Sequence, residues 1–216
     1  MLTVFIYFMI FVGVTAALYQ VYEVNYNINF ANDLKLSNAD KERLSELSHK
    51  ALLAKQTGGS ADFDQAVAHT FGPQMNPHMA LLAFTEEKAG TYAIPLLRRR
   101  GQLDVSGELR VRHLSFCKTR LPTWDARVLM ISLVIVNSML AQFLGGMSIY
   151  TLLYPFSSAA FTWLNEPPVL MLLTFVLIAI SHGIFRLDMY LHDLYQIGKL
   201  ARLTSADNRH LHSQKA

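Results

Sequence analysis

The sequence predicts a mainly α-helical membrane protein: three transmembrane helices, a small and mostly helical cytoplasmic domain between the first two, and an amphipathic cytoplasmic extension of the third. Three observations predict this fold. The stretches Leu2–Tyr19, Val128–Tyr154 and Pro168–Phe185 contain no Asp, Glu, Lys or Arg. Basic residues cluster beside the second and third stretches, and the segment between the first two shows helical periodicity. With 216 residues, 52% of them hydrophobic, the chain accommodates three spans and one modest domain.

The first transmembrane helix is expected over residues 1–20. Leu2–Tyr19 has 18 residues, which as a helix would measure about 27 Å and just cross the hydrocarbon core. No basic segment precedes it, and its apolar run is longer than that of a typical signal peptide. We therefore expect it to be retained as a span.

Residues 21–127 are expected to form the cytoplasmic domain. Residues 22–30 alternate apolar and polar side chains, which favours a strand or extended segment, although a helix end carrying interfacial tyrosines fits equally well. Ser37 and Asp40 have capping-box spacing and predict a helix over residues 38–55. Residues 57–60 end that helix and begin a second one over residues 61–70.

The second half of the domain is less regular. Asn76-Pro77 predicts a third helix that ends near Gly90. Beyond Thr91 the helical pattern degrades. Residues 109–116 alternate weakly and are expected to pair with residues 103–105 across a turn at Ser106-Gly107.

The second and third transmembrane helices are expected over residues 128–154 and 168–186, joined by a short external loop over residues 155–167. Residues 187–203 then continue as an amphipathic helix, which can pack on the domain, on a partner helix or on the lipid surface. Its apolar face is the candidate partner-docking surface, made of Leu187, Tyr190, Leu191, Leu194, Ile197 and Leu200. Residues 204–216 are polar and are expected to be a disordered tail.

The positive-inside rule orients the three spans consistently. Basic residues flank the start of the second span and the end of the third, whereas residues 155–167 contain none. The N-terminus is therefore expected outside, with the domain and the C-terminus in the cytoplasm. These features are compatible with a bacterial inner membrane. The single cysteine, Cys117, fits the reducing cytoplasm that this orientation gives it.

The second span carries the most informative face. Small side chains recur at intervals of three and four and would let another helix approach closely, while two amides beside them lie near the middle of the membrane. This face consists of Asn137, Ser138, Ala141, Gln142, Gly145 and Ser148. Gly13 and Ala17 of the first span offer a matching surface. Packing within the chain is the favoured interpretation, and a partner-binding face is the alternative.

The candidate reactive groups do not form a catalytic or metal-binding constellation, so no cofactor, metal or enzymatic activity is expected. His182 is the one histidine within the three expected spans. A metal or haem bound there would need a second ligand, and neither other span supplies a His, Cys or carboxylate. Asp188 and His192 have the spacing of helical metal ligands, but we favour a side-chain pair on a solvated face. Asp62 and Asp64 suit a helix N-terminus better than a metal site. Further pairs of reactive side chains are offered by His113 with Cys117 and by His210 with His212.

Arg98, Arg99 and Arg100 form a basic cluster, for which two interpretations are equally favoured. The cluster could contact anionic lipid at the membrane surface, or it could form salt bridges with nearby acidic residues. Charge in the domain is otherwise nearly balanced, which argues against nucleic-acid binding.

Together these patterns predict a multi-pass inner-membrane protein that is a non-enzymatic accessory or assembly subunit and docks a partner through its cytoplasmic domain. Its expected contacts are membrane lipid and either other membrane subunits or further copies of itself. The alternative function is an oligomeric channel or transport component whose second span lines the pore with Asn137, Gln142 and Ser148.

Overall fold

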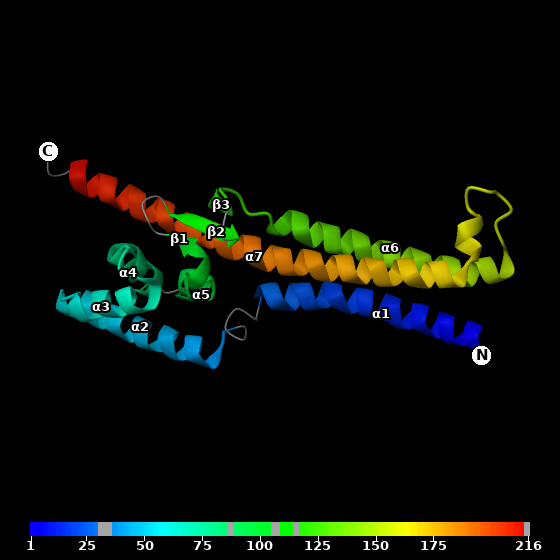
Figure 1. The fold of residues 1–216 in the computed structure, drawn as a ribbon, viewed down its shortest axis with the longest axis horizontal. Helices are drawn as coiled ribbons and strands as arrows, with labels where there is room; N and C mark the ends of the chain where they lie inside the picture. Colours follow the sequence, from blue (N-terminus) through cyan, green and yellow to red (C-terminus); the bar gives the residue numbers. More distant parts are fainter. Residues whose placement is uncertain (30–35, 86–88, 105–108, 115–116, 214–216) are drawn as a thin grey trace. The chain divides into compact units, whose positions relative to one another are not determined.

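The computed structural model describes residues 1–29, 36–85, 89–104, 109–114 and 117–213. The chain divides into two compact units (Figure 1). The three-helix unit comprises Met1–Asn29 and Ala126–Met189, and the domain unit comprises Phe30–Asp125 and Tyr190–Ala216. The unit boundaries at 125/126 and 189/190 fall close to the expected ends of the cytoplasmic domain and of the third span.

The three-helix unit is built from helices α1 (Leu2–Asn29) and α6 (Arg127–Leu153) and the first half of α7 (Pro167–Ser213). Among the described residues, these three helices are long and apolar enough to cross a membrane. Figure 1 shows α6 running antiparallel to α1 and to this half of α7. The buried apolar side chains of this unit include Ile6, Ile10, Leu144, Leu164 and Leu170.

The connection from α6 to α7 contains a short 3₁₀ helix, η3 (Thr162–Asn165). Asn165 holds this connection closed, because its side chain accepts a hydrogen bond from the Phe156 backbone N–H at 2.9 Å and donates one to the Phe156 carbonyl at 2.8 Å. The start of α7 at Pro167 agrees with the prediction, since the fixed φ of proline suits the first helical turn.

Helix α1 extends beyond the predicted end of the first span. It continues as regular helix to Asn29, so the strand alternative for residues 22–30 is wrong over the described residues, and the helix-end alternative is correct. Tyr19, Tyr22 and Tyr26 share one exposed side of the helix, with ring centroids 5.9 and 6.2 Å apart along the series. The period-two pattern was misleading because these tyrosines, three and four residues apart, also satisfy the helical period.

The domain unit contains helices, one short 3₁₀ helix and short strands in its described part, together with the end of α7. These elements are α2 (Asn38–Thr57), α3 (Ala61–Phe71), α4 (Pro77–Thr85), α5 (Ala89–Arg99), η2 (Arg100–Gln102), β1 (Leu103–Asp104), β2 (Arg110–Leu114) and β3 (Cys117–Arg120).

Helix α2 confirms the predicted cap and extends two residues beyond the predicted end at residue 55. The Ser37 hydroxyl accepts a hydrogen bond from the Asp40 backbone N–H at 3.1 Å, which satisfies one of the free donors at the helix N-terminus. Gly58 ends the helix with a φ of 71°, a left-handed conformation that glycine adopts without steric cost. The second predicted helix is likewise present as α3.

The region from Pro77 to Arg99 differs from the prediction. The helix that begins at Pro77 ends at Thr85 rather than near Gly90, and Gly90 lies in the first turn of a further helix, α5, that the sequence did not indicate. Pro95 lies inside α5 and breaks the usual helical signal. Its ring is nonetheless buried together with Ile94 and Leu96, so tertiary packing outweighs the poor local propensity.

The described strands form an antiparallel sheet in the order β1-β2-β3. Leu103 pairs with Val111 and Asp104 with Arg110, as predicted for this hairpin, while residues 105–108 of its turn and residues 115–116 lie outside the described part. The third strand, β3, was not predicted. Val111 pairs with Thr119 and is fully buried, so the sheet contributes to the core of the domain unit.

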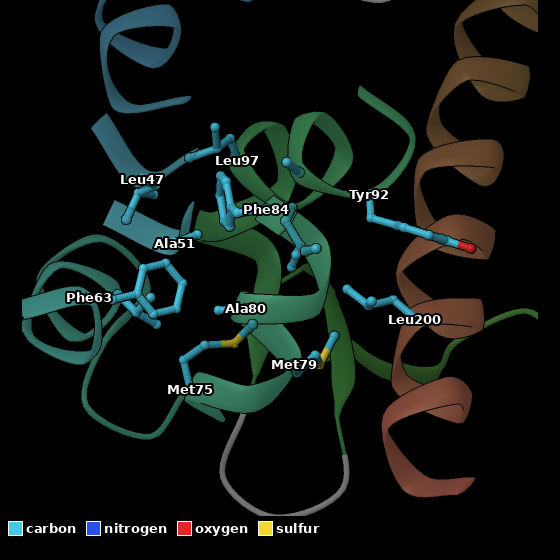
Figure 2. Packing of buried hydrophobic residues seen from close by; sticks show 14 of the residues in the cluster. Leu47, Ala51, Phe63, Met75, Met79, Ala80, Phe84, Tyr92, Leu97 and Leu200 are labelled. Carbon is cyan, nitrogen blue, oxygen red and sulfur yellow. The ribbon is translucent and has the colours of Figure 1, made fainter. Parts of the chain in front are cut away.

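The core of the domain unit joins α2, α3, α4 and α5 to the second half of α7 (Figure 2). Phe63 of α3, Phe84 of α4 and Leu97 of α5 are almost completely buried in it. Ile197 and Leu200 of α7 belong to the same cluster, with exposed fractions of 0% and 1%. The domain core is therefore completed by two residues of α7 that lie far from the rest of the core in the sequence.

The expectation of a disordered tail from residue 204 is wrong for the part that the structure describes, because α7 continues to Ser213. Extending an existing helix needs no new nucleation, and residues 201–213 contain neither glycine nor proline to stop it. Thr204 is buried, which ties this segment to the domain unit. Residues 214–216 lie outside the described part.

Candidate functional site

The small-residue face of α6 lies inside the three-helix unit. Ser138, Ala141 and Ser148 have exposed fractions of 3%, 0% and 1%. A Cβ atom added to Gly145 would lie 2.5 Å from Cγ2 of Val14, so glycine is required where α6 meets α1. This arrangement corresponds to the favoured interpretation of packing within the chain.

Gly13 and Ala17 lie in the same interior, but Gly13 faces a different helix from the one that the sequence suggested. A Cβ atom added to Gly13 would lie 2.8 Å from Cγ2 of Thr174 on α7. Gly145 of α6 does not face Gly13 but contacts Val14, the next residue of α1. The two small-residue surfaces therefore serve two different contacts of α1, one with α6 and one with α7.

The two amides of α6 occupy different environments. Asn137 is half-buried, and its Nδ2 atom is enclosed without a hydrogen-bond partner among the described residues. Gln142 is exposed, and its Nε2 donates to the carbonyl of Ser138 at a long 3.4 Å. Since Ser148 is buried, the three polar side chains of the channel hypothesis do not share one face.

Gln20 makes a polar contact between helices that was not predicted from the sequence. Its Nε2 atom donates to the backbone carbonyl of Ile178 at 3.1 Å and so joins α1 to α7. The signal was available, because Gln20 follows Gly13 and Ala17 at helical spacing and therefore shares their buried face.

Asp188 does not lie on the solvated face that was expected for the pair of Asp188 and His192. Asp188 is 4% exposed, and its Oδ2 lies 3.7 Å from Nε of Arg127 within the three-helix unit. His192 is paired within the domain unit, where Nδ1 lies 3.3 Å from Oδ2 of Asp125 and Nε2 lies 3.2 Å from Nε2 of Gln196. Both ring nitrogens have a partner, so this imidazole fastens the segment before α6 to α7.

Gly198 also allows the segment before α6 to pack against α7. A Cβ atom at this position would come within 3.1 Å of Cβ of Leu121 and 3.2 Å of the Pro122 carbonyl oxygen. A side chain here would push the segment that ends at Asp125 away from α7. Glycine therefore allows the approach in which Asp125 reaches His192.

Arg98 and Arg99 converge on one buried carboxylate in the domain unit. Asp193 is 4% exposed at its side chain, and Nη1 of Arg98 and Nε of Arg99 lie 3.1 and 2.9 Å from its two oxygens. The guanidinium carbon of Arg99 also lies 4.7 Å from the ring centroid of Tyr190, a cation–π geometry. Burial raises the pKa of Tyr190, and the positive charge of Arg99 partly opposes that increase.

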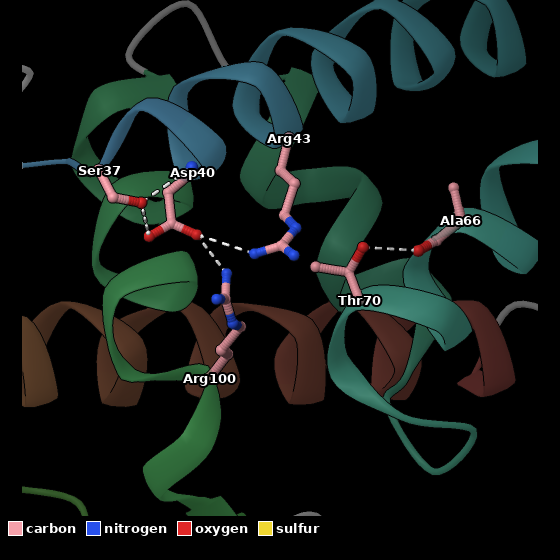
Figure 3. Close-up of polar contacts among 6 residues, drawn as sticks. All are labelled: Ser37, Asp40, Arg43, Ala66, Thr70 and Arg100. Carbon is pink, nitrogen blue, oxygen red and sulfur yellow. Dashed lines mark hydrogen bonds and ion pairs between the residues drawn. The ribbon is translucent and has the colours of Figure 1, made fainter.

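Arg100 pairs with a different carboxylate, Asp40 at the start of α2 (Figure 3). Arg43 lies 3.2 Å from the same oxygen, and Ser37 donates to the other at 2.8 Å. Burial opposes ionisation of Asp40, but the hydrogen bonds from Ser37 and Arg100, the charge of Arg100 and the hydrogen bond from Arg43 outweigh it and hold the pKa of Asp40 below its ordinary value.

The basic cluster thus makes the salt bridges of one of its two interpretations, and contact of these arginines with anionic lipid stays a prediction. Arg98 and Arg99 connect α5 to α7, and Arg100 connects η2 to α2. The sequence signal was incomplete because the acidic partners are 60 to 95 positions away.

The candidate partner-docking face of α7 contributes to the chain's own core instead. Leu194, Ile197 and Leu200 have exposed fractions of 2%, 0% and 1%, and Tyr190 and Leu191 are half-buried. Leu187, in the three-helix unit, remains 46% exposed. Of the three surfaces considered for this helix, the domain is the one that it contacts in the structure.

The remaining reactive side chains do not assemble into a site. In the described part of the chain, no three His, Cys, Asp or Glu side chains are grouped so as to hold a metal ion. Asp64 of α3 accepts a hydrogen bond from the Ser60 hydroxyl at 2.9 Å, and His182 is exposed. His113 and Cys117 lie on strands, which rules out their helical spacing, and their side chains, like those of His210 and His212, lie outside the described part.

Comparisons with known protein families, with curated proteins and with solved structures find no match to this chain.

Proposed function

We propose that this chain is a non-enzymatic subunit of a bacterial inner-membrane assembly and that its cytoplasmic domain docks a partner protein. In this proposal the N-terminus lies outside, α1, α6 and the first half of α7 cross the membrane, and the domain unit lies in the cytoplasm. The basic residues that flank α6 and follow the span in α7 support this orientation.

The observation that carries the proposal is how the domain unit uses its charged side chains. Asp40, Asp193 and His192 are the types of group that a catalytic site would employ. Asp40 and Asp193 each join one structural element to another through ion pairs, and His192 does so through its contact with Asp125. Such contacts stabilise a scaffold, because each of these side chains is held by a partner from another part of the chain.

The surface on which a partner would dock is the outer side of α2. Leu52 and Leu53 are 50% and 45% exposed there, although α2 buries Leu47 and Ala51 on its other side. Two adjacent exposed leucines on an otherwise polar helix mark a site where burial by a partner would be favourable, by about 1.5 to 3 kcal/mol for each fully buried side chain.

The proposal is tested by site-specific photocrosslinking of the full-length protein in native membranes. A photoreactive residue at position 52 or 53 should give a stoichiometric adduct with a different protein, which mass spectrometry of the purified adduct identifies. The matched control is position 65, because Gln65 is exposed on α3 but lies in a polar setting. Equal labelling at position 65, or the absence of an adduct at both leucines, would contradict partner docking by α2.

The orientation is tested separately with a membrane-impermeant thiol reagent on intact cells. In a background in which Cys117 is replaced by serine, a cysteine at exposed Ser158 should react and a cysteine at Gln65 should react only after the cells are opened. The opposite pattern would invert the proposed topology.

A further inference from the structure

We propose that α6 pairs with α6 of a second copy of this chain, along a seam of exposed residues centred on Gln142. The proposal shares with the function proposed above only that α6 crosses the membrane, and it does not depend on docking of a partner by the domain unit. It concerns a side of α6 other than the one that packs against α1, and it rests on the spacing, the exposure and the hydrogen-bonding chemistry of that side.

The seam follows the spacing of a coiled coil. Its residues recur at intervals of four and three, so they form one continuous stripe when two helices wind around each other in a left-handed sense. They are Ile135, Met139, Gln142, Gly146, Ile149 and Leu153.

All six seam residues are exposed in the structure. Met139, Ile149 and Leu153 have exposed fractions of 63%, 66% and 74%. The buried residues of α6, such as Ser138 and Ala141, precede seam residues by one position and therefore lie about 100° away around the helix. The contacts with α1 consequently leave the seam open.

Gln142 makes it unfavourable for the seam to be exposed to lipid. It lies about 22 Å along the helix from Arg127 and about 17 Å from Leu153, close to the middle of a membrane of ordinary thickness. Within the described chain, its one hydrogen bond is the long contact to the Ser138 carbonyl, which already lies in a helical backbone. An amide in hydrocarbon needs a donor and an acceptor from another polar group.

The chemistry of the amide favours a second copy as the occupant. A glutamine side chain carries both a donor and an acceptor, so two Gln142 side chains related by a two-fold axis can exchange a reciprocal pair of hydrogen bonds. Gly146 lies one turn further on, where a Cβ atom would meet nothing within 4 Å in the single chain. The missing side chain lets the two backbones approach beside the paired amides.

The test is cysteine crosslinking of the full-length protein in native membranes, with Cys117 first replaced by serine. Cysteines at Met139 and Ile149 should form disulfide-linked dimers on mild oxidation. Cysteines at Val136 and Leu140, which are 52% and 46% exposed on a neighbouring side of the helix, are the matched controls and should not. Crosslinking that is equal at seam and control positions, or absent from the seam, would overturn the proposal.

A second measurement addresses the energetics and the identity of the occupant. Gln142→Leu should raise the dissociation constant of the detergent-solubilised dimer by about threefold to thirtyfold, the range expected for hydrogen bonds between membrane helices, whereas Gln142→Asn should retain part of the association. Unchanged dimerisation of Gln142→Leu would overturn the role of the amide. A photoreactive residue at position 139 that captures a different protein would overturn the assignment of a second copy.

Discussion

At the scale of single residues, the elements of the domain unit are joined by two carboxylates, each of which forms ion pairs with two arginines. Asp40 forms ion pairs with Arg43 and Arg100, and Asp193 forms ion pairs with Arg98 and Arg99. In both cases a carboxylate from one helix is shared with a guanidinium from an element distant in sequence. Isolated surface salt bridges contribute little, but shared and partly buried ones fix the relative position of the elements that they join.

Replacing Asp40 by asparagine should destabilise the domain unit by about 1 to 2 kcal/mol, because the neutral amide loses the charge-assisted bonds to both arginines. Pulse proteolysis of the full-length protein measures this change. Glu42→Gln is the matched control, since Glu42 is exposed on α2 beyond its first turn, and it should be nearly neutral. A similar loss in both variants would show that Asp40 has no special role.

The same carboxyl gives the domain an acid sensitivity with a defined sign. Because the pKa of Asp40 is lower in the folded domain than the ordinary value of 3.8, its stabilising contribution is present at neutral pH and is lost as the pH falls below about 4 through the folded pKa. Hydrogen exchange of the first turn of α2, followed from pH 7 to pH 3, should show this loss in the wild type and not in Asp40→Asn.

At the scale of elements, α6 uses two adjacent glycines for different purposes. A Cβ atom on Gly145 would collide with Val14, whereas one on Gly146 would enter open space. The inner side of the helix is thus determined by close packing with α1, and the adjoining side is free for contacts outside the chain.

We therefore expect Gly145→Leu to disrupt the packing of the three-helix unit without preventing insertion, and Gly146→Leu to leave that packing intact. The thermal stability of the detergent-solubilised protein measures the difference: Gly145→Leu should lower the melting temperature by several degrees, because overpacking costs about 1 to 3 kcal/mol. Equal melting temperatures for the two variants would contradict the contact with Val14.

The elements also show what the sequence could and could not predict. Long apolar stretches and local caps such as Ser37 carry their own signal, so α1, α2, α6 and the start of α7 were predictable. Helix α5 was not, because Pro95 hides its helical pattern and burial by distant residues stabilises it. Of the candidate site, the small-residue face was predictable from spacing, but the partner of Gly13 and the acidic partners of the arginines depend on tertiary structure.

At the scale of the whole molecule, the C-terminal part of α7 is an integral part of the domain that precedes α6. Ile197 and Leu200 belong to its core, and Asp193 forms ion pairs with two of its arginines. A chain that ends at Met189 should retain its three spans but have a domain that is rapidly degraded by added protease, whereas a chain that ends at Ala206 should resist. Equal resistance of the two chains would show that the domain folds without α7.

This dependence has a consequence for biosynthesis. Residues 36–125 emerge from the ribosome well before Leu200, and at about 5 to 20 residues per second the remaining 75 or so residues take about 4 to 15 s to synthesise. Throughout that interval the apolar sides of α2, α4 and α5 lack the helix that completes their core. The two later apolar segments, α6 and the first half of α7, are also synthesised before the segment that completes the core. Nascent chains should therefore present a binding site for chaperones that vanishes once the end of α7 has been synthesised and has joined the domain.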